Sequence, residues 1–341
     1  MTTSASTTAA VVRALTVAAR HAAHPEAADP AAGSPCRACG RDETVLADRS
    51  DGVVVRHGAA VAKAHAPATD PAGHRARLSV AAHPLLAGIL LPPLPATTTT
   101  ATATATAAPH IEGRPVTAWP YGTPVDPDRP DDAPWEAAAT LLARLHAVPP
   151  AGLAPSPLPP MRGPLKAARA LARMRAAGHH PATADVERAW AGLPAWARDE
   201  APAPVGGLLC HGDLHLGQLV RHPVPDGPWL LIDVDDLGLG DAAWDLARPA
   251  AWYAAGLLAP DEWQRFLGAY RSAGGPAVPA DGDPWPRLDV AARALTVQTA
   301  ALAVAKSTEQ GRELDEVEET MIETCARIAT LPAKLAAGPS S

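Results

Sequence analysis

The sequence has few cysteines and few lysines, and it carries no excess of positive charge. Four irregularly spaced cysteines in 341 residues are too few for the disulfide framework of a secreted protein, so we expect a reducing, cytoplasmic environment. The formal net charge is −7 and no basic cluster offsets it, which argues against nucleic-acid binding. Only four lysines accompany twenty-five arginines, so each lysine is more informative than usual.

Long apolar segments are also missing. The N-terminus lacks the cationic segment and apolar core of a signal peptide. The most apolar helical segment, residues 288–305, carries Asp289 and Arg293 near its start, and its uninterrupted part is too short to cross a bilayer. We therefore expect a buried helix there and no membrane partner. A chain of this length can bury a sizeable core in two lobes.

The chemically richest stretch is residues 210–246, where seven acidic residues lie in an apolar, glycine-punctuated sequence. A His-Gly-Asp sequence ending at Asp213 is followed five residues later by Gln218, and a short apolar run ends at Asp233. In a phosphoryl-transfer loop, one carboxylate orients and deprotonates a hydroxyl, while an amide and a second carboxylate hold Mg²⁺ against the nucleotide phosphates. The order and spacing of these residues therefore predict such a loop.

Three segments resemble the aminoglycoside phosphotransferase/choline kinase-like family: HGDLHLGQ, LIDVDD and GDAAWDLA. The first of them, with His215 and with Gln218 in place of the commoner Asn, is similar to the form found in some bacterial sugar kinases. The resemblance extends over most of residues 42–330 and is dense between 208 and 248. It implies an α+β, two-lobed protein-kinase-like fold with a small β-rich N-lobe and a mostly helical C-lobe.

The resemblance divides the chain into four parts. They are an N-terminal extension (1–40), an N-lobe with nucleotide-binding strands and hinge (41–121), a helical C-lobe with the catalytic loop (122–332) and a flexible tail (333–341). The extension contains an amphipathic helix at 9–23, which we expect to be loosely attached, with an interaction arm as the alternative. Short antiparallel strands are expected between 43 and 64. C-lobe helices are expected at 134–148, 165–177, 184–193, 246–258, 261–272, 288–306 and 314–331.

Lys63 is the only lysine among the first 165 residues and lies on the third of these strands. The resemblance implies that it binds the α- and β-phosphates of ATP. The turn that contains Ser50 and Gly52 has the small and polar residues that let backbone N–H groups approach phosphate oxygens. In the family, a glutamate on the following helix holds this lysine. Here that helix, at 73–82, contains no acidic residue, and the nearest upstream one is Asp70.

Residues 114–122 are expected to form a strand that leads into the hinge. The resemblance implies that Ala118, Trp119 and Tyr121 surround the adenine. Packing of the two aromatic side chains at the lobe junction explains them equally well.

The resemblance also assigns roles in the catalytic loop. Asp213 is the expected base, with a turn-capping aspartate as the alternative, and Gln218 and Asp233 are the expected Mg²⁺ ligands. The role of His211 is structural, beneath the loop, and Asp245 is expected to brace the loop by accepting its backbone N–H bonds.

Two further residues have alternative roles. Asp235 and its neighbour Asp236 are expected to bind a second Mg²⁺ ion or a cationic acceptor, or else to lie in a solvated loop. His215 is expected to contact the γ-phosphate or the acceptor, or else to pack within the loop.

Cys36 and Cys39 form a lone C-x-x-C pair. A zinc site would need two more ligands, and the nearest are His21, His24 and His57, none at the usual spacing. A redox site would need a βαβ context that the sequence lacks. An ordinary turn is therefore favoured over a metal or redox site.

These observations predict an ATP-dependent phosphotransferase that moves the γ-phosphate of Mg-ATP to a hydroxyl of a small molecule. The acceptor is expected to be an amino sugar, an aminoglycoside or another sugar. One alternative is a peptide Ser/Thr kinase that modifies a peptide natural product. The other is a nucleotide-binding pseudokinase module, favoured by Gln218 and by the absence of the helix glutamate.

Overall fold

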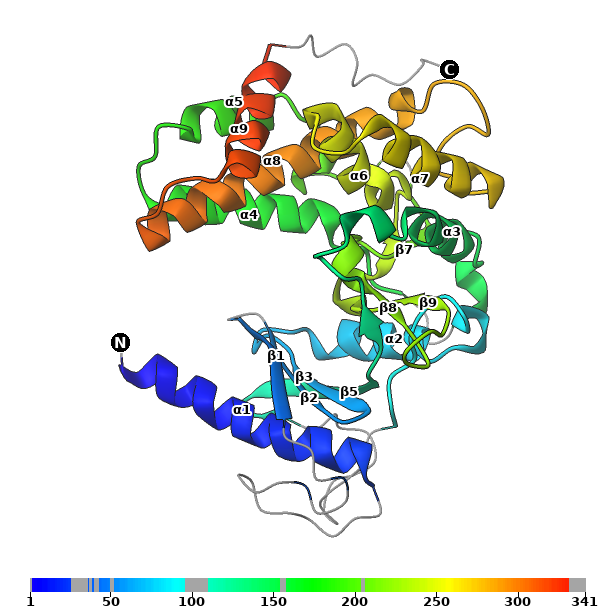
Figure 1. Cartoon of the computed structure of the whole chain (residues 1–341). Coiled ribbons are helices and arrows are strands. Elements are labelled where there is room, and N and C mark those ends of the chain that lie inside the picture. The colour runs from blue at the N-terminus through cyan, green and yellow to red at the C-terminus, as the bar shows by residue number, and fades with distance from the viewer. Residues whose placement is uncertain are drawn as a thin grey trace. The chain divides into compact units, whose positions relative to one another are not determined.

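A computed structural model describes residues 2–25, 36, 39, 43–49, 52–95, 110–153, 158–203 and 206–330 (Figure 1). The chain divides into two compact units. The first unit comprises residues 1–124 and the segment Val220–Ile232, and the second comprises Val125–Leu219 and the chain from Asp233 onward. The tail predicted at 333–341 lies outside the described residues.

An antiparallel sheet forms the centre of the first unit, in the strand order β1-β2-β3-β5-β4. Alternate residues of β2 and β3 are buried, which is the period expected of strands with one covered face. Pairing of β3 with β5 places Lys63 opposite Thr117. The elements of this unit are α1 (Thr2–Ala23), β1 (Glu43–Arg49), β2 (Gly52–His57), β3 (Ala60–Ala64), α2 (Pro71–Ala81), β4 (His110–Ile111), β5 (Arg114–Pro120), β6 (Thr123–Pro124), β8 (Leu219–Arg221) and β9 (Trp229–Leu231).

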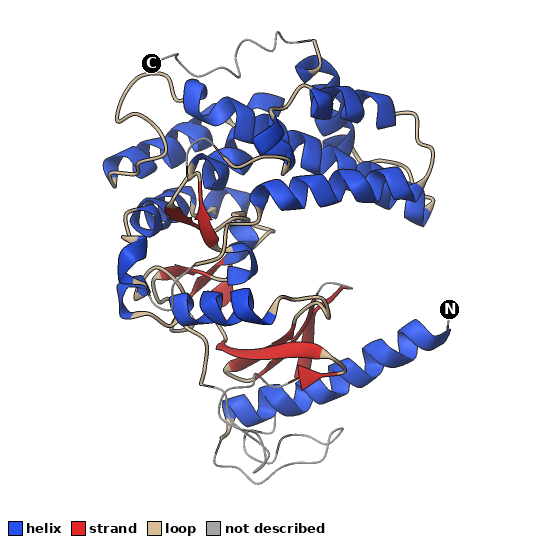
Figure 2. Cartoon of the chain, turned by 180° about the vertical axis from the view of Figure 1, so that it is seen from behind, coloured by secondary structure: helices blue, strands red, loops and turns tan. Residues whose placement is uncertain are grey.

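Helix α1 lies along one face of this sheet (Figures 1 and 2). Val11, Leu15 and Ala19, spaced four residues apart, are almost fully buried and share a core with β2, β3 and β5. Arg20 also forms an ion pair with Glu43 at the start of β1. The prediction that this helix is loosely attached is therefore wrong. The apolar stripe of α1 consists mainly of alanine and valine, so its sequence indicated a core-forming helix only weakly.

The second unit is mostly helical, as Figure 2 shows. Its central helix, α8, packs against α4, α5, α6 and α9. By length and composition α8 could cross a membrane, but 72% of its most apolar window is buried inside the structure, as in the core helix of a folded unit. The helices and strands are α3 (Trp135–His146), α4 (Gly163–Ala177), α5 (Thr183–Ala191), β7 (Leu208–Cys210), β10 (Gly238–Gly240), α6 (Ala243–Ala255), α7 (Pro260–Ser272), α8 (Trp285–Gln310) and α9 (Glu316–Ile328).

Candidate active site

The predicted catalytic loop follows β7, which pairs with β10 in an antiparallel ribbon. The single-turn 3-10 helix η6 (Val234–Asp236) precedes β10 and lies against this loop. Gly212 has φ +86°, and a Cβ atom built on it would lie 2.3 Å from the carbonyl oxygen of Asp236. Only glycine combines this backbone conformation with this close approach. The glycine of the His-Gly-Asp sequence therefore allows the loop and η6 to meet.

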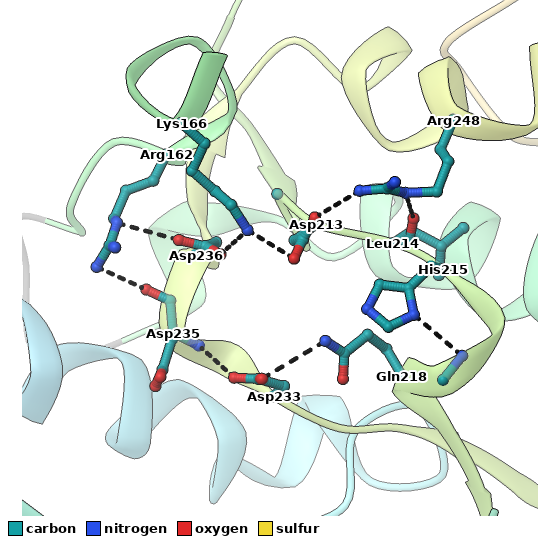
Figure 3. A network of polar contacts seen from close by, with 12 residues as sticks. Arg162, Lys166, Asp213, Leu214, His215, Gln218, Asp233, Asp235, Asp236 and Arg248 are labelled. Atoms are coloured by element: carbon teal, nitrogen blue, oxygen red, sulfur yellow. Dashed lines mark hydrogen bonds and ion pairs between the residues drawn. The ribbon is translucent and has the colours of Figure 1, made fainter. Parts of the chain in front are cut away.

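Asp213 is held between two cationic side chains (Figure 3). Its Oδ2 lies 2.6 Å from Nζ of Lys166, and its Oδ1 accepts a 3.0 Å hydrogen bond from Nη2 of Arg248. Arg248 also donates to the carbonyl oxygen of Leu214. Burial would raise the pKa of Asp213, but Lys166 and Arg248 more than offset it and hold this pKa below its usual value. The carboxylate is therefore ionised at neutral pH.

Lys166, in the first turn of α4, contacts Asp213 and was not predicted from the sequence. Besides contacting Asp213, the Nζ atom of Lys166 lies 2.7 Å from Oδ2 of Asp236. Arg162 forms an ion pair with the other carboxylate oxygen of Asp236, at 3.0 Å (Figure 3). Burial would lower the pKa of Lys166, but the two carboxylates raise it. One feature of the sequence could have identified Lys166. Lysine is scarce in this chain, and the reasoning that singled out Lys63 holds equally for Lys166.

Asp245, at the start of α6, is buried beneath the loop. Its carboxylate accepts hydrogen bonds from the backbone N–H groups of His211, at 2.6 Å, and Gly212, at 2.7 Å. His146 donates to it from Nε2 at 2.9 Å and contacts the hydroxyl of Tyr270 through Nδ1 at 2.7 Å. Burial would raise the pKa of Asp245, but His146 and the loop N–H groups lower it below its usual value. This chain of hydrogen bonds ties the loop to α3, α6 and α7.

Gln218 and Asp233 lie side by side, with Nε2 of Gln218 3.5 Å from Oδ2 of Asp233 (Figure 3). Asp233 adopts a left-handed backbone conformation, with φ 60° and ψ 75°. Its carboxylate also faces the backbone N–H of Asp235 at 3.5 Å. Mg²⁺ prefers oxygen ligands, and a half-turn of the Gln218 amide would direct its oxygen toward Asp233. The two side chains therefore fit a magnesium site.

His215 and Asp235 flank these groups. His215 is exposed, and its Nδ1 accepts a 3.1 Å hydrogen bond from the N–H of Gly217. The surrounding protein and the Arg248 guanidinium lower the pKa of His215 to about 4, so the ring is neutral at physiological pH. The carbonyl oxygen of Asp235 lies 3.5 Å from Nη1 of Arg162.

The predicted phosphate-binding residues lie in the first unit. Lys63 is on β3, where its Cε lies 3.8 Å from the position that a Cβ atom on Gly52 would take. Ser50 lies outside the described residues. Helix α2 contains no acidic residue, and Asp70 caps its N-terminus by accepting a 2.7 Å hydrogen bond from the N–H of Gly73.

The predicted adenine-binding residues lie on β5 and just after it. Ala118 is paired with β3 within the sheet. The Trp119 indole N–H donates to the Thr117 hydroxyl at 2.9 Å, and the Arg56 guanidinium lies 3.3 Å above the ring of Tyr121. Both contacts are made within the first unit, and the expected contact with adenine stays a prediction.

Comparison with known proteins places these features in a family. A sequence profile described as the phosphotransferase enzyme family (APH) matches residues 43–289, which is most of the chain. The chain belongs to this family. The match begins at β1 and ends in α8. In this phosphotransferase it therefore includes both the strand that carries Lys63 and the loop that carries Asp213. The search of curated proteins found no match in sequence.

Solved structures share the fold of the phosphotransferase at low sequence identity. A choline/ethanolamine kinase family protein from Mesorhizobium loti is 16% identical, with a TM-score of 0.54 over 87% of this chain and 92% of its own. A thermostable mutant of aminoglycoside phosphotransferase APH(4)-Ia is 14% identical, with a TM-score of 0.54 over 85% and 95%. Spectinomycin phosphotransferase APH(9)-Ia is 13% identical, with a TM-score of 0.52 over 86% and 92%. The predicted family and the α+β, protein-kinase-like fold are thus confirmed.

Proposed function

We propose that this phosphotransferase transfers the γ-phosphate of Mg-ATP to a hydroxyl group of a small molecule in the cytoplasm. An amino sugar, an aminoglycoside or another sugar is the proposed acceptor. The observation that carries the proposal is the carboxylate of Asp213, held by Lys166 and Arg248 on a loop that also presents Gln218 beside Asp233. Proteins of similar fold support it: spectinomycin phosphotransferase was crystallised with ADP and spectinomycin, and APH(4)-Ia with AMP-PNP and hygromycin B.

Asp213 aligns the acceptor hydroxyl and takes its proton. The acceptor oxygen forms a bond to the γ-phosphorus, the bond from that phosphorus to the bridging oxygen breaks, and ADP leaves. The proton needs a base only late, when bonding to phosphorus has made the hydroxyl acidic, so a carboxylate of low pKa suffices. Lys166 and Arg248 keep the carboxylate ionised and supply positive charge for the phosphoryl oxygens.

Gln218 and Asp233 are the residues that would hold Mg²⁺, which when bound neutralises charge on the phosphate oxygens. Lys63 is the proposed ligand of the α- and β-phosphates. Gly52, the first residue of β2, is proposed to approach the phosphates, and Ala118, Trp119 and Tyr121 are proposed to contact the adenine.

The test is turnover on a panel of amino sugars, aminoglycosides and neutral sugars. ADP release is measured with the purified full-length protein and Mg-ATP, and the phosphorylated product is identified by ³¹P NMR and mass spectrometry. Asp213→Asn is expected to lower kcat by about 10²- to 10⁴-fold. The matched control is Asp281→Asn, at an exposed loop position, and it should leave kcat unchanged. Full activity in Asp213→Asn would reject Asp213 as the base.

A second candidate function is a nucleotide-binding module without catalysis. The observation in its favour is helix α2, which lacks the glutamate of the family and whose nearby Asp70 is used as a helix cap. A rise in Tm with ATP and Mg²⁺, but no turnover on sugars or peptides, would support this candidate. Product formation on any acceptor would exclude it.

A further inference from the structure

Four side chains with metal-binding atoms meet in the first unit, and none of them is assigned to phosphoryl transfer. His24 follows the end of α1, His57 ends β2, and Cys36 and Cys39 lie in the connection between α1 and β1. One ligand atom from each of the four lies within 4.8 Å of the other three. Cys39 Sγ is 3.3 Å from His57 Nε2, and the rings of His24 and His57 meet edge to face with their centroids 5.6 Å apart.

This spacing suits tetrahedral zinc. With Zn–S bonds of about 2.3 Å and Zn–N bonds of about 2.0–2.1 Å, neighbouring ligand atoms are roughly 3.3–3.8 Å apart. The contact between Cys39 and His57 already has that length, and the remaining distances would shorten by about 1.5 Å or less. Two thiolates and two neutral imidazoles balance the charge of Zn²⁺. The ion therefore suits a cluster in which Cys36 and His57 are buried.

The surroundings of the two histidines also suit metal ligands. Metal-binding histidines usually present their second ring nitrogen to a carboxylate or carbonyl group. Here Nδ1 of His57 lies 3.7 Å from Oε1 of Glu43, while its Nε2 faces the cysteine. Glu43 is held in turn by Arg20 of α1. Nε2 of His24 is buried and makes no hydrogen bond within the described part of the chain.

We propose that His24, Cys36, Cys39 and His57 bind a structural zinc ion that fastens the end of α1 to β2. Four protein ligands complete the tetrahedron and leave no open position for substrate, so the ion would stabilise the unit rather than react. The ligands come from a helix end, a connecting segment and a strand end, which explains why no zinc motif is visible in the sequence. This proposal departs from the ordinary turn that the sequence favoured at Cys36 and Cys39.

The first test is the metal content of the full-length protein, purified without chelators and measured by inductively coupled plasma mass spectrometry. One zinc ion per chain is expected. His24→Ala and Cys39→Ser are each expected to reduce the zinc content at least tenfold. The matched controls are His21→Ala, in the last turn of α1 but outside the cluster, and Cys325→Ser, buried in α9. Both variants should retain one zinc ion. Zinc retained equally in all four variants would overturn the proposal.

The second test remains decisive if ligand variants fail to fold. The wild-type protein, stripped of metal and titrated with Co²⁺, is expected to show thiolate-to-cobalt charge transfer and the intense visible bands of tetrahedral cobalt. Cys39→Ser, where it folds, should lose the charge-transfer intensity in part. A wild-type protein that holds neither zinc nor tetrahedral cobalt would overturn the proposal, as would a Cys36–Cys39 disulfide that persists under reducing purification. Asp213→Asn should bind zinc normally, which separates this result from the outcome for phosphoryl transfer.

Discussion

At the scale of single residues, Lys166 and Arg248 hold the pKa of Asp213 below its usual value, which bears on the proposed role of Asp213 as a base. Lys166→Met removes one of them, so the pKa of Asp213 should rise. A base works in its deprotonated form, so the acid limb of kcat/KM should move to higher pH. The measurement is the pH dependence of kcat/KM with the best acceptor.

Two control variants show whether a shift of the acid limb is caused by the loss of the Lys166 charge. Lys166→Arg keeps the charge and should restore the wild-type acid limb, whereas a loss of packing alone would not be restored in this way. Lys306→Met alters an exposed lysine of α8 and should leave the profile unchanged. An unshifted acid limb in Lys166→Met would show that Lys166 does not set the protonation of Asp213.

Sequence spacing was enough to select Asp213, Gln218 and Asp233, because they lie within a short stretch whose chemistry is local. Lys166 and Arg248 were not foreseen. They reach Asp213 from α4 and α6, and only the packing of these helices brings them to the loop. A charge partner that is distant in sequence leaves no pattern that the spacing of the loop could show.

At the scale of elements, the close approach of the catalytic loop to η6 depends on Gly212. Gly212→Ala should strain the backbone and push the loop away from Asp236, because the added Cβ would meet a carbonyl oxygen at 2.3 Å. We expect kcat to fall by about 10²-fold, as for a displacement of catalytic groups by about 1 Å. The measurement is kcat together with Tm.

The matched control is Gly256→Ala. Gly256 has φ +81°, close to that of Gly212, but its Cβ would meet no atom within 4 Å. This variant should lose about 1–2 kcal/mol of stability from backbone strain while keeping its kcat. Equal loss of kcat in both variants would show that strain, rather than contact with η6, disables the loop.

The brace formed by Asp245 should make the protein sensitive to acid. Its folded pKa lies below the ordinary value of 3.8, so its contribution to stability is complete above that value and is lost as the pH falls through the folded pKa. Asp245→Asn should destabilise the second unit by roughly 3 kcal/mol at pH 7, because one loop N–H loses its acceptor. The difference in Tm from wild type should shrink below about pH 4. A difference that is constant with pH would contradict this account.

Most helices of the second unit lie close to their predicted ranges because their apolar residues recur at helical spacing; α4 and α7 are examples. The attachment of α1 was not predictable in the same way. A stripe of alanine and valine identifies a helix, but the sheet that covers it is formed by strands that follow later in the chain.

At the scale of the whole molecule, α1 is part of the core of the first unit. Leu15 is fully buried there, so Leu15→Ala should lower the stability of this unit by about 2–4 kcal/mol. Thermal unfolding and limited proteolysis of β1–β5 would measure the loss. Leu46→Ala, at a position that is 49% exposed on β1, is the control and should change little. An unchanged Tm in Leu15→Ala would mean that α1 does not support the sheet.

The division into units illustrates a limit of local sequence patterns. The segment Val220–Ile232 belongs to the first unit, where β8 pairs with β6 through Thr123 and Arg221. A sequence pattern can identify a short strand. It does not identify a partner strand that lies far away in the chain.

The left-handed backbone conformation of Asp233 implies a trade-off between thermal stability and activity. A non-glycine residue in that conformation is strained. Selection for heat resistance alone should therefore favour asparagine or glycine at this position, which would relax the chain and remove one charge. Selection for phosphoryl transfer should restore the aspartate each time, because Asp233 is a proposed Mg²⁺ ligand and a neutral side chain would bind the ion less tightly.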